Sequence, residues 1–139
     1  MERRALQIIL AVLSLIPLIG VAVGYTLGTA ALIPSGAEIH VDLDNQFRYL
    51  SGIYLCISLG IWYTLPKIEE RVVPLRIVGA GVFFGALGRV SSMIAHGLPD
   101  NPVMVGGVVL EGVVVPLLLL WQTRLARAHA AANQKDGRG

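Results

Sequence analysis

The sequence contains few charged residues and a single cysteine, and both shortages narrow the class of protein. Charged side chains make up 14% of the 139 residues, whereas a soluble globular domain carries about 25%. Apolar residues make up 55% of the chain, and its mean hydropathy is +0.70. The lone Cys56 lies in an apolar segment, where we expect a small buried side chain and no intramolecular disulfide. These values exclude a soluble globular domain and indicate a membrane protein.

The sequence also lacks the short motifs of the common catalytic and cofactor-binding sites. It contains no Gly-rich phosphate loop, no paired metal-ligand cysteines and no haem attachment sequence. The acids and histidines around the first and third connections between apolar segments have spacings that match no recognised metal site: His40, Asp42, Asp44, His96 and Asp100. No serine lies in a recognisable nucleophile motif. We therefore expect neither enzyme activity nor a bound metal or cofactor.

Four apolar segments are long enough to cross a bilayer, which requires about 20 residues of helix. They cover residues 5–33, 47–65, 77–95 and 103–121. The connection at residues 96–102 is short, so the third and fourth segments are predicted to form an antiparallel hairpin. The predicted fold class is all-α, an integral membrane four-helix bundle within residues 1–123. Residues 124–139 are predicted to form a basic tail, in which 124–132 extend the fourth helix and 133–139 are disordered.

The basic residues predict which side of the membrane each connection faces. Nine of the eleven Lys and Arg residues fall on one side: Arg3, Arg4, Lys67, Arg71, Arg76, Arg124, Arg127, Lys135 and Arg138. Because Lys and Arg are enriched in cytoplasmic loops, both termini are predicted to be cytoplasmic. The net charge of +2 reflects this inner rim, so we expect the lipid bilayer, and not nucleic acid, as a partner.

Arg89 and Glu111 require an explanation, since each lies inside a segment that is otherwise apolar. A central Arg or Asp costs roughly 2.5 to 3.5 kcal/mol on insertion, so such groups usually pair with each other or mark a site. Arg89 lies six or seven residues before the third connection and Glu111 about nine after it. Their depths below the outer surface therefore match. Asp44 and Arg48, one turn apart near the start of the second span, complete a formally neutral set of four charges.

Small residues accompany these charges and predict the faces on which the helices pack. Gly20, Gly24 and Gly28 recur at intervals of four and form one stripe on the first segment. Glycine lets helices approach closely in lipid, so this stripe is predicted to face protein, either within this chain or in a second copy. Pro17 is expected to kink the same segment or to relax its hydrogen bonding. One face of the third segment carries Gly81, Gly85, Arg89, Ser92 and His96.

The four charges support two main interpretations. A third, a proton or ion pathway, is disfavoured because no second acidic or His group lies in the inner half of any span. In the first, they form a structural clamp in which Glu111 pairs with Arg89, with or without Arg48, and fixes helix register. In the second, they line an outer-facing pocket for a small polar or anionic ligand, with supporting residues at Asn45, Gly52, Gly85, Ser92 and His96. The clamp would suit a non-catalytic accessory subunit that docks on a larger membrane complex or forms a homo-oligomer. The pocket would suit a binding protein.

The same residues carry a resemblance to a known family. The quoted features are Asn45, Phe47-Arg48, Gly52 and Tyr54, the segment from Phe84-Gly85 to Gly88-Arg89 with Ser92, the Gly97 and Pro99 turn, and Glu111. Over residues 10–121 this pattern resembles a bacterial family of small four-span membrane proteins catalogued as domain of unknown function 4345. The resemblance implies four spans in a bacterial inner membrane, with key residues Arg48, Gly52, Arg89 and Glu111. It implies no activity.

Overall fold

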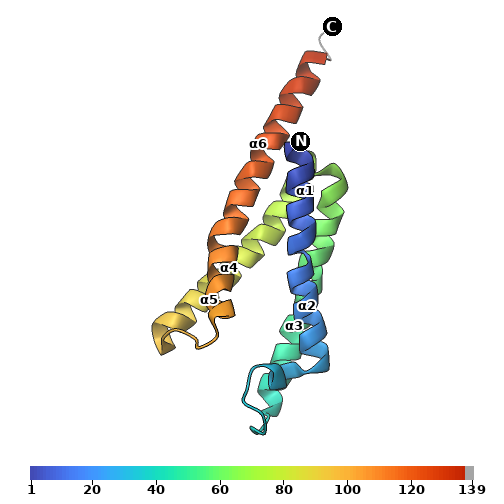
Figure 1. The fold of residues 1–139 in the computed structure, drawn as a ribbon. Helices are drawn as coiled ribbons and strands as arrows, with labels where there is room; N and C mark the ends of the chain where they lie inside the picture. The colour runs from blue at the N-terminus through green and yellow to red at the C-terminus, as the bar shows by residue number, and fades with distance from the viewer. Residues whose placement is uncertain (137–139) are drawn as a thin grey trace. The chain divides into compact units, whose positions relative to one another are not determined.

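The computed structural model describes residues 1–136, and within that range it contains helices and connecting segments but no strand (Figure 1). The helices are α1 (Glu2–Leu13), α2 (Leu15–Thr26), η1 (Gly28–Ala31), α3 (Val41–Thr64), η2 (Leu65–Lys67), α4 (Val72–His96), α5 (Pro102–Val109), η3 (Leu110–Val114) and α6 (Val115–Asp136). The all-α fold class predicted from the sequence is therefore confirmed.

Four helical stretches are long and apolar enough to cross a membrane. They run over Glu2–Thr26, Val41–Lys67, Val72–His96 and Pro102–Lys135. The first ends before the predicted residue 33, because Gly28 adopts φ +60° and terminates α2. The fourth continues well past residue 121, so the prediction of disorder is wrong for residues 133–136, which are helical. Residues 137–139, also predicted to be disordered, lie outside the described range.

The tertiary contacts divide the chain into two compact units. Unit 1 comprises Met1–Leu6 together with the chain from Lys67 onward, and unit 2 comprises Gln7–Pro66. In unit 2, α2 packs along α3 and η1 contacts the start of the same helix. In unit 1, α4 packs along the continuous run of α5, η3 and α6, which confirms the predicted hairpin (Figure 1). Each unit is thus built on an antiparallel pair of helices.

The glycine stripe on the first segment packs against α3. A Cβ atom at Gly20 would lie 2.8 Å from the Tyr54 ring, and one at Gly24 would overlap the Ser51 side chain. From the other side, a Cβ at Gly52 would lie 2.6 Å from the Tyr25 hydroxyl. Close backbone approach is what small residues contribute when lipid supplies little hydrophobic drive between helices. The stripe is therefore an intrachain packing surface, which decides between the two alternatives left open by its spacing.

A buried hydrogen-bond network lies where α1 gives way to α2. Pro17 has no N–H for the Leu13 carbonyl and its ring crowds that carbonyl, so the helix breaks at Ser14. The Ser14 carbonyl accepts a hydrogen bond from the Ser58 hydroxyl at 2.9 Å, and the Ser14 hydroxyl accepts one from the Trp62 indole at 2.9 Å. The disturbance predicted at Pro17 is present as this interruption of the helix, and α3 donates hydrogen bonds to both oxygens of Ser14 there.

The α4 face that packs on α6 differs from the small-residue face predicted from the sequence. Leu75, Gly79 and Ala86 are buried, and a Cβ at Gly79 would lie 2.6 Å from Leu119. Gly85 lies roughly 100° and Gly81 roughly 140° around the helix from that face. A Cβ built at either position meets nothing within 4 Å. Within unit 1, the prediction that the packing face coincides with Gly81 and Gly85 is wrong.

Cys56 is exposed on the protein surface, and the prediction that it is buried is therefore wrong. Its position in the middle of α3 places it on a face turned away from α2. An apolar helix in a membrane can present a thiol to lipid without the desolvation cost that makes cysteine a core residue in water.

Substitution of Gly24 tests the helix contact in unit 2. Gly24→Ala is expected to lower the free energy of unfolding by about 1 to 3 kcal/mol, because the added methyl group overlaps Ser51 and overpacks the interface. Gly81→Ala is the matched control, since its methyl group enters open space and alanine favours helix by about 1 kcal/mol. Denaturant titration in detergent measures both. Equal stability of the Gly24 and Gly81 variants would contradict the packing described.

Candidate functional site

The four charges selected from the sequence form two ion pairs, one in each unit. In unit 2, the Arg48 Nε donates to Asp44 Oδ2 at 2.6 Å. In unit 1, the Arg89 Nε donates to Glu111 Oε2 at 3.0 Å. Each acid thus pairs with a base of its own hairpin.

The Asp44–Arg48 pair joins α3 to the end of α2. Asp44 Oδ1 accepts hydrogen bonds from the Thr29 backbone N–H at 2.7 Å and from the Thr29 hydroxyl at 3.0 Å. Arg48 Nη1 donates to the Tyr25 carbonyl at 2.6 Å. A carboxylate thus accepts from one N–H group and one hydroxyl at the start of η1, and a guanidinium donates to a carbonyl in the last turn of α2. Both charges satisfy helix ends, so this pair is a structural clamp.

Gly28 makes this clamp possible. Its φ of +60° turns the chain between α2 and η1, and a Cβ there would overlap Asp44 and lie 2.5 Å from Arg48 Nη2. Glycine is therefore required both for the backbone conformation and for the close approach of two charged side chains. The glycine stripe ends where the ion pair begins.

The Arg89–Glu111 pair connects α4 to η3 and leaves part of the guanidinium free. Besides the Nε contact, Arg89 Nη2 lies 3.5 Å from Glu111 Oε1, at the outer limit of a hydrogen bond. No other hydrogen bond to Arg89 forms within the described residues 1–136. The Arg89 side chain is 37% exposed and that of Glu111 is 24% exposed. A guanidinium has five N–H donors, so both hydrogens on Nη1 and one on Nη2 have no protein acceptor.

Glu111 lies in a π-helical turn, and Pro116 gives the physical reason. Residues Leu110–Val114 form η3, in which the Val115 N–H donates to the Leu110 carbonyl five residues earlier. Pro116 has no N–H for the Gly112 carbonyl and its ring crowds that group, which disfavours the usual α-helical turn. Single π-turns occur often at functional sites. This one sets the position of Glu111 opposite Arg89.

Space adjoins the ion pair on the side of the small residues. A Cβ at Gly85 or Gly88 would meet nothing within 4 Å. Gly107 lies beneath the pair, since its Cβ would lie 3.9 Å both from Arg89 Cζ and from Glu111 Oε1. Arg89 therefore occupies the border between the face of α4 that packs on α5 to α6 and the open glycine face.

The supporting residues fall into two groups. Gly52 lies at the α2 contact described above and thus belongs to the packing of unit 2. The side chains of Asn45, Ser92 and His96 are exposed and make no hydrogen bond or ion pair within residues 1–136. Ser92 and His96 follow Arg89 along the open face of α4.

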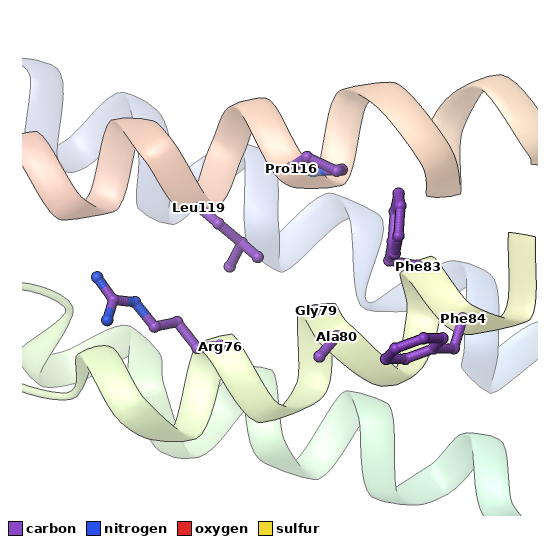
Figure 2. A pocket seen from close by; sticks show the side chains of 7 residues that line it. All are labelled: Arg76, Gly79, Ala80, Phe83, Phe84, Pro116 and Leu119. Carbon is purple, nitrogen blue, oxygen red and sulfur yellow. The ribbon is translucent and has the colours of Figure 1, made fainter. Parts of the chain in front are cut away.

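Sequence reasoning missed three contributors to these sites. Thr29 and the Tyr25 carbonyl complete the Asp44–Arg48 clamp, and the signal for them was Gly28, whose place after α2 marks a helix end. Pro116, five residues after Glu111, signalled the irregular turn. The structure also contains a groove that none of the predicted site residues lines (Figure 2).

The comparisons with known proteins give one family. The family model described as Domain of unknown function (DUF4345) matches residues 5–122, which confirms the resemblance carried by the charged and glycine motifs. No curated protein and no solved structure matches the chain.

Removal of one charge tests the clamp in unit 2. Asp44→Asn preserves side-chain size but removes the anionic partner of Arg48, so a lower thermal midpoint is expected. Asp42→Asn is the control, because Asp42 is exposed in the same first turn of α3 and makes no described contact. Thermal denaturation in detergent compares the two variants. Identical midpoints would show that the ion pair contributes nothing to the joint between α2 and α3.

Proposed function

Because the chain belongs to the DUF4345 family and carries four helices of membrane-spanning length, we propose that it is a multi-pass protein of the bacterial cytoplasmic membrane. Both termini face the cytoplasm in this proposal. The support is the distribution of Lys and Arg, which gather at the termini and in the segment between α3 and α4. The segment before α3 carries Glu38 and lies on the outer side.

Thiol labelling tests this orientation. In a Cys56→Ala background, Glu38→Cys is expected to react with a membrane-impermeant maleimide in intact cells, because residue 38 lies in the outer connection. Gln134→Cys, near the end of α6, is expected to react only after the membrane is permeabilised. The opposite pattern would reverse the proposed topology.

The function that the geometry supports best is the binding of a small polar ligand at Arg89. The observation that carries this proposal is the set of three Arg89 N–H donors without a protein acceptor. Inside hydrocarbon, a donor without an acceptor costs several kcal/mol. A ligand with carboxylate- or phosphate-type oxygens would satisfy these donors, because the planar guanidinium binds such groups through two parallel hydrogen bonds.

The surroundings of Arg89 suit a ligand of this class. Gly85 and Gly88 leave room beside the guanidinium, and the Ser92 hydroxyl lies one turn further along the same face. Glu111 holds Arg89 in place and makes the pair formally neutral, so a polar ligand with no net charge fits as well as an anion. We propose binding without catalysis, because no nucleophile paired with a base lies among these side chains.

An accessory role in a larger membrane complex is the second candidate, and one observation favours it. Gly81, Gly85 and Gly88 form a small-residue stripe on α4 that has no partner within unit 1. Small residues in a membrane helix are typical of a surface that another helix approaches closely. The Gly20, Gly24 and Gly28 stripe no longer supports this role, since α3 already covers it.

A double substitution separates a binding site from a structural clamp. Arg89→Met with Glu111→Leu replaces the ion pair by apolar side chains of similar volume, a change that is often neutral or stabilising. The double variant is expected to keep the wild-type thermal midpoint and to lose a small molecule that co-purifies with the wild-type protein. Native mass spectrometry after gentle solubilisation measures the retained mass.

The matched control removes a different ion pair from unit 1. Lys67→Gln with Glu70→Gln deletes an exposed pair and is expected to leave the retained ligand unchanged. Retention of the ligand by the Arg89 and Glu111 double variant would contradict the binding proposal. A wild-type sample that carries a protein partner and no small molecule would favour the accessory role.

A further inference from the structure

A groove between α4 and α6 combines an apolar floor with a cation at one end. It has a volume of about 290 Å³ and is lined by Arg76, Gly79, Ala80, Phe83, Phe84, Pro116 and Leu119. Figure 2 shows Arg76 at one end of the groove and the two phenylalanines toward the other. All of these residues belong to unit 1. The groove is separate from the Arg89 site, because neither Arg89 nor Glu111 lines it.

The packing of the two helices accounts for the shape of the groove. At Gly79 the helices approach closely, since a Cβ there would lie 2.6 Å from Leu119. Beyond that point, Phe83 projects toward α6 and Pro116 presents only its compact ring, as Figure 2 shows. The space between these contacts has no protein side chain to fill it. Its lining there is entirely hydrocarbon, apart from Arg76 at the end.

Arg76 presents unused donors at the mouth of the groove. Its Nη2 donates to the Thr123 hydroxyl at 3.2 Å, and its side chain is otherwise exposed. Arg76 lies four residues inside the start of α4, or about 6 Å along the helix axis, and Phe84 lies about 12 Å further. Arg127 follows Thr123 by one turn on the same face of α6. Positive charge is therefore concentrated at the end of the groove nearest the helix terminus.

The groove is thus charged at the end nearest the helix terminus and apolar further along α4. An amphiphile that enters from the membrane interface has its charged and apolar parts in the same order. A phospholipid carries its phosphate at the interface and its acyl chain toward the bilayer centre. Basic pockets between membrane helices bind anionic headgroups, and an arginine binds phosphate oxygens through paired hydrogen bonds. Small-molecule pockets usually enclose about 300 to 1,000 Å³. The groove, of about 290 Å³, suits a single chain lying along the helices better than a compact ligand.

We propose that the groove between α4 and α6 binds an anionic phospholipid of the phosphatidylglycerol type, with one acyl chain against Phe83, Phe84 and Pro116 and the phosphate on Arg76. The lipid completes the surface of unit 1 where the helices diverge, and Arg76 selects for negative charge. Both α4 and α6 contact the same lipid, which therefore stabilises the hairpin that also carries Arg89 and Glu111.

Lipid retention by the purified full-length protein tests this proposal. The protein is delipidated in mild detergent and titrated with phosphatidylglycerol or with phosphatidylethanolamine, and bound lipid is counted by native mass spectrometry. Wild-type protein is expected to retain phosphatidylglycerol in preference. Arg76→Gln is expected to weaken that binding roughly tenfold, since it removes a charge-assisted hydrogen bond. Arg76→Lys is expected to give an intermediate affinity, because the lysine ammonium keeps the positive charge but lacks the paired N–H donors of the guanidinium.

A second variant tests the apolar part without changing the charge. Ala80→Leu fills the groove and is expected to lower lipid retention while Arg76 remains in place. Gly81→Leu is its control, because position 81 is the next residue on α4 and its Cβ meets nothing within 4 Å. The thermal midpoint without lipid shows whether each variant folds, and Ala80→Leu provides the test if Arg76→Gln does not.

Three results would overturn the proposal. One is equal retention of the two lipids by the wild-type protein, and another is unchanged retention in both Arg76→Gln and Ala80→Leu. The third is displacement of the lipid by excess inorganic phosphate alone, which would show that the acyl chain contributes nothing. Loss of lipid in Ala80→Leu but not in Gly81→Leu would support the groove as the site.

Discussion

Charges inside apolar helices impose the strongest constraint on this protein, because lipid supplies no water to solvate them. Unit 2 meets the constraint with Asp44 and Arg48, and unit 1 meets it with Arg89 and Glu111. The two pairs differ in how many of their hydrogen-bonding atoms have a partner. Both carboxylate oxygens of Asp44 accept hydrogen bonds, and Arg48 also binds a carbonyl at the end of α2. Among the described residues Arg89 has only Glu111 as a hydrogen-bond partner, so of these two arginines it is the one that combines a fixed position with several free donors.

Two prolines lie beside the irregular turns that carry polar groups within the apolar segments. Pro17 breaks the first segment at Ser14, and α3 supplies Ser58 and Trp62 to the groups exposed there. Pro116 disturbs the fourth segment and leaves a π-turn that carries Glu111. In both places the helix departs from regular α-helical geometry near the proline. Side chains of the facing helix contact the polar groups there, namely Ser58 and Trp62 in unit 2 and Arg89 in unit 1. The first break is closed by hydrogen bonds within the unit, whereas the second sets up the proposed binding site.

Glycines perform two different tasks on the two hairpins. Gly20, Gly24 and Gly28 bring α2 against α3, and Gly28 also makes room for the ion pair. On α4, only Gly79 brings the helices of unit 1 together, while Gly81, Gly85 and Gly88 leave open space beside Arg89. Spacing alone predicted packing for both stripes, because an interval of four places residues on one face whatever that face contacts. Whether the space beside a glycine is occupied or open depends on the partner helix.

The sequence by itself determined the all-α class, the number of helices long enough to span a membrane, the family and the matched depth of Arg89 and Glu111. Those features follow from local rules: span length, residue motifs, and equal distances along two helices from one short turn. Only the tertiary structure decided that each acid pairs with the base of its own hairpin, that the Gly20 stripe contacts α3, and that a groove opens beside Arg76. These features depend on how each helix is rotated and tilted against its neighbour. That rotation results from side-chain packing between segments distant in sequence, which periodicity along one segment does not specify.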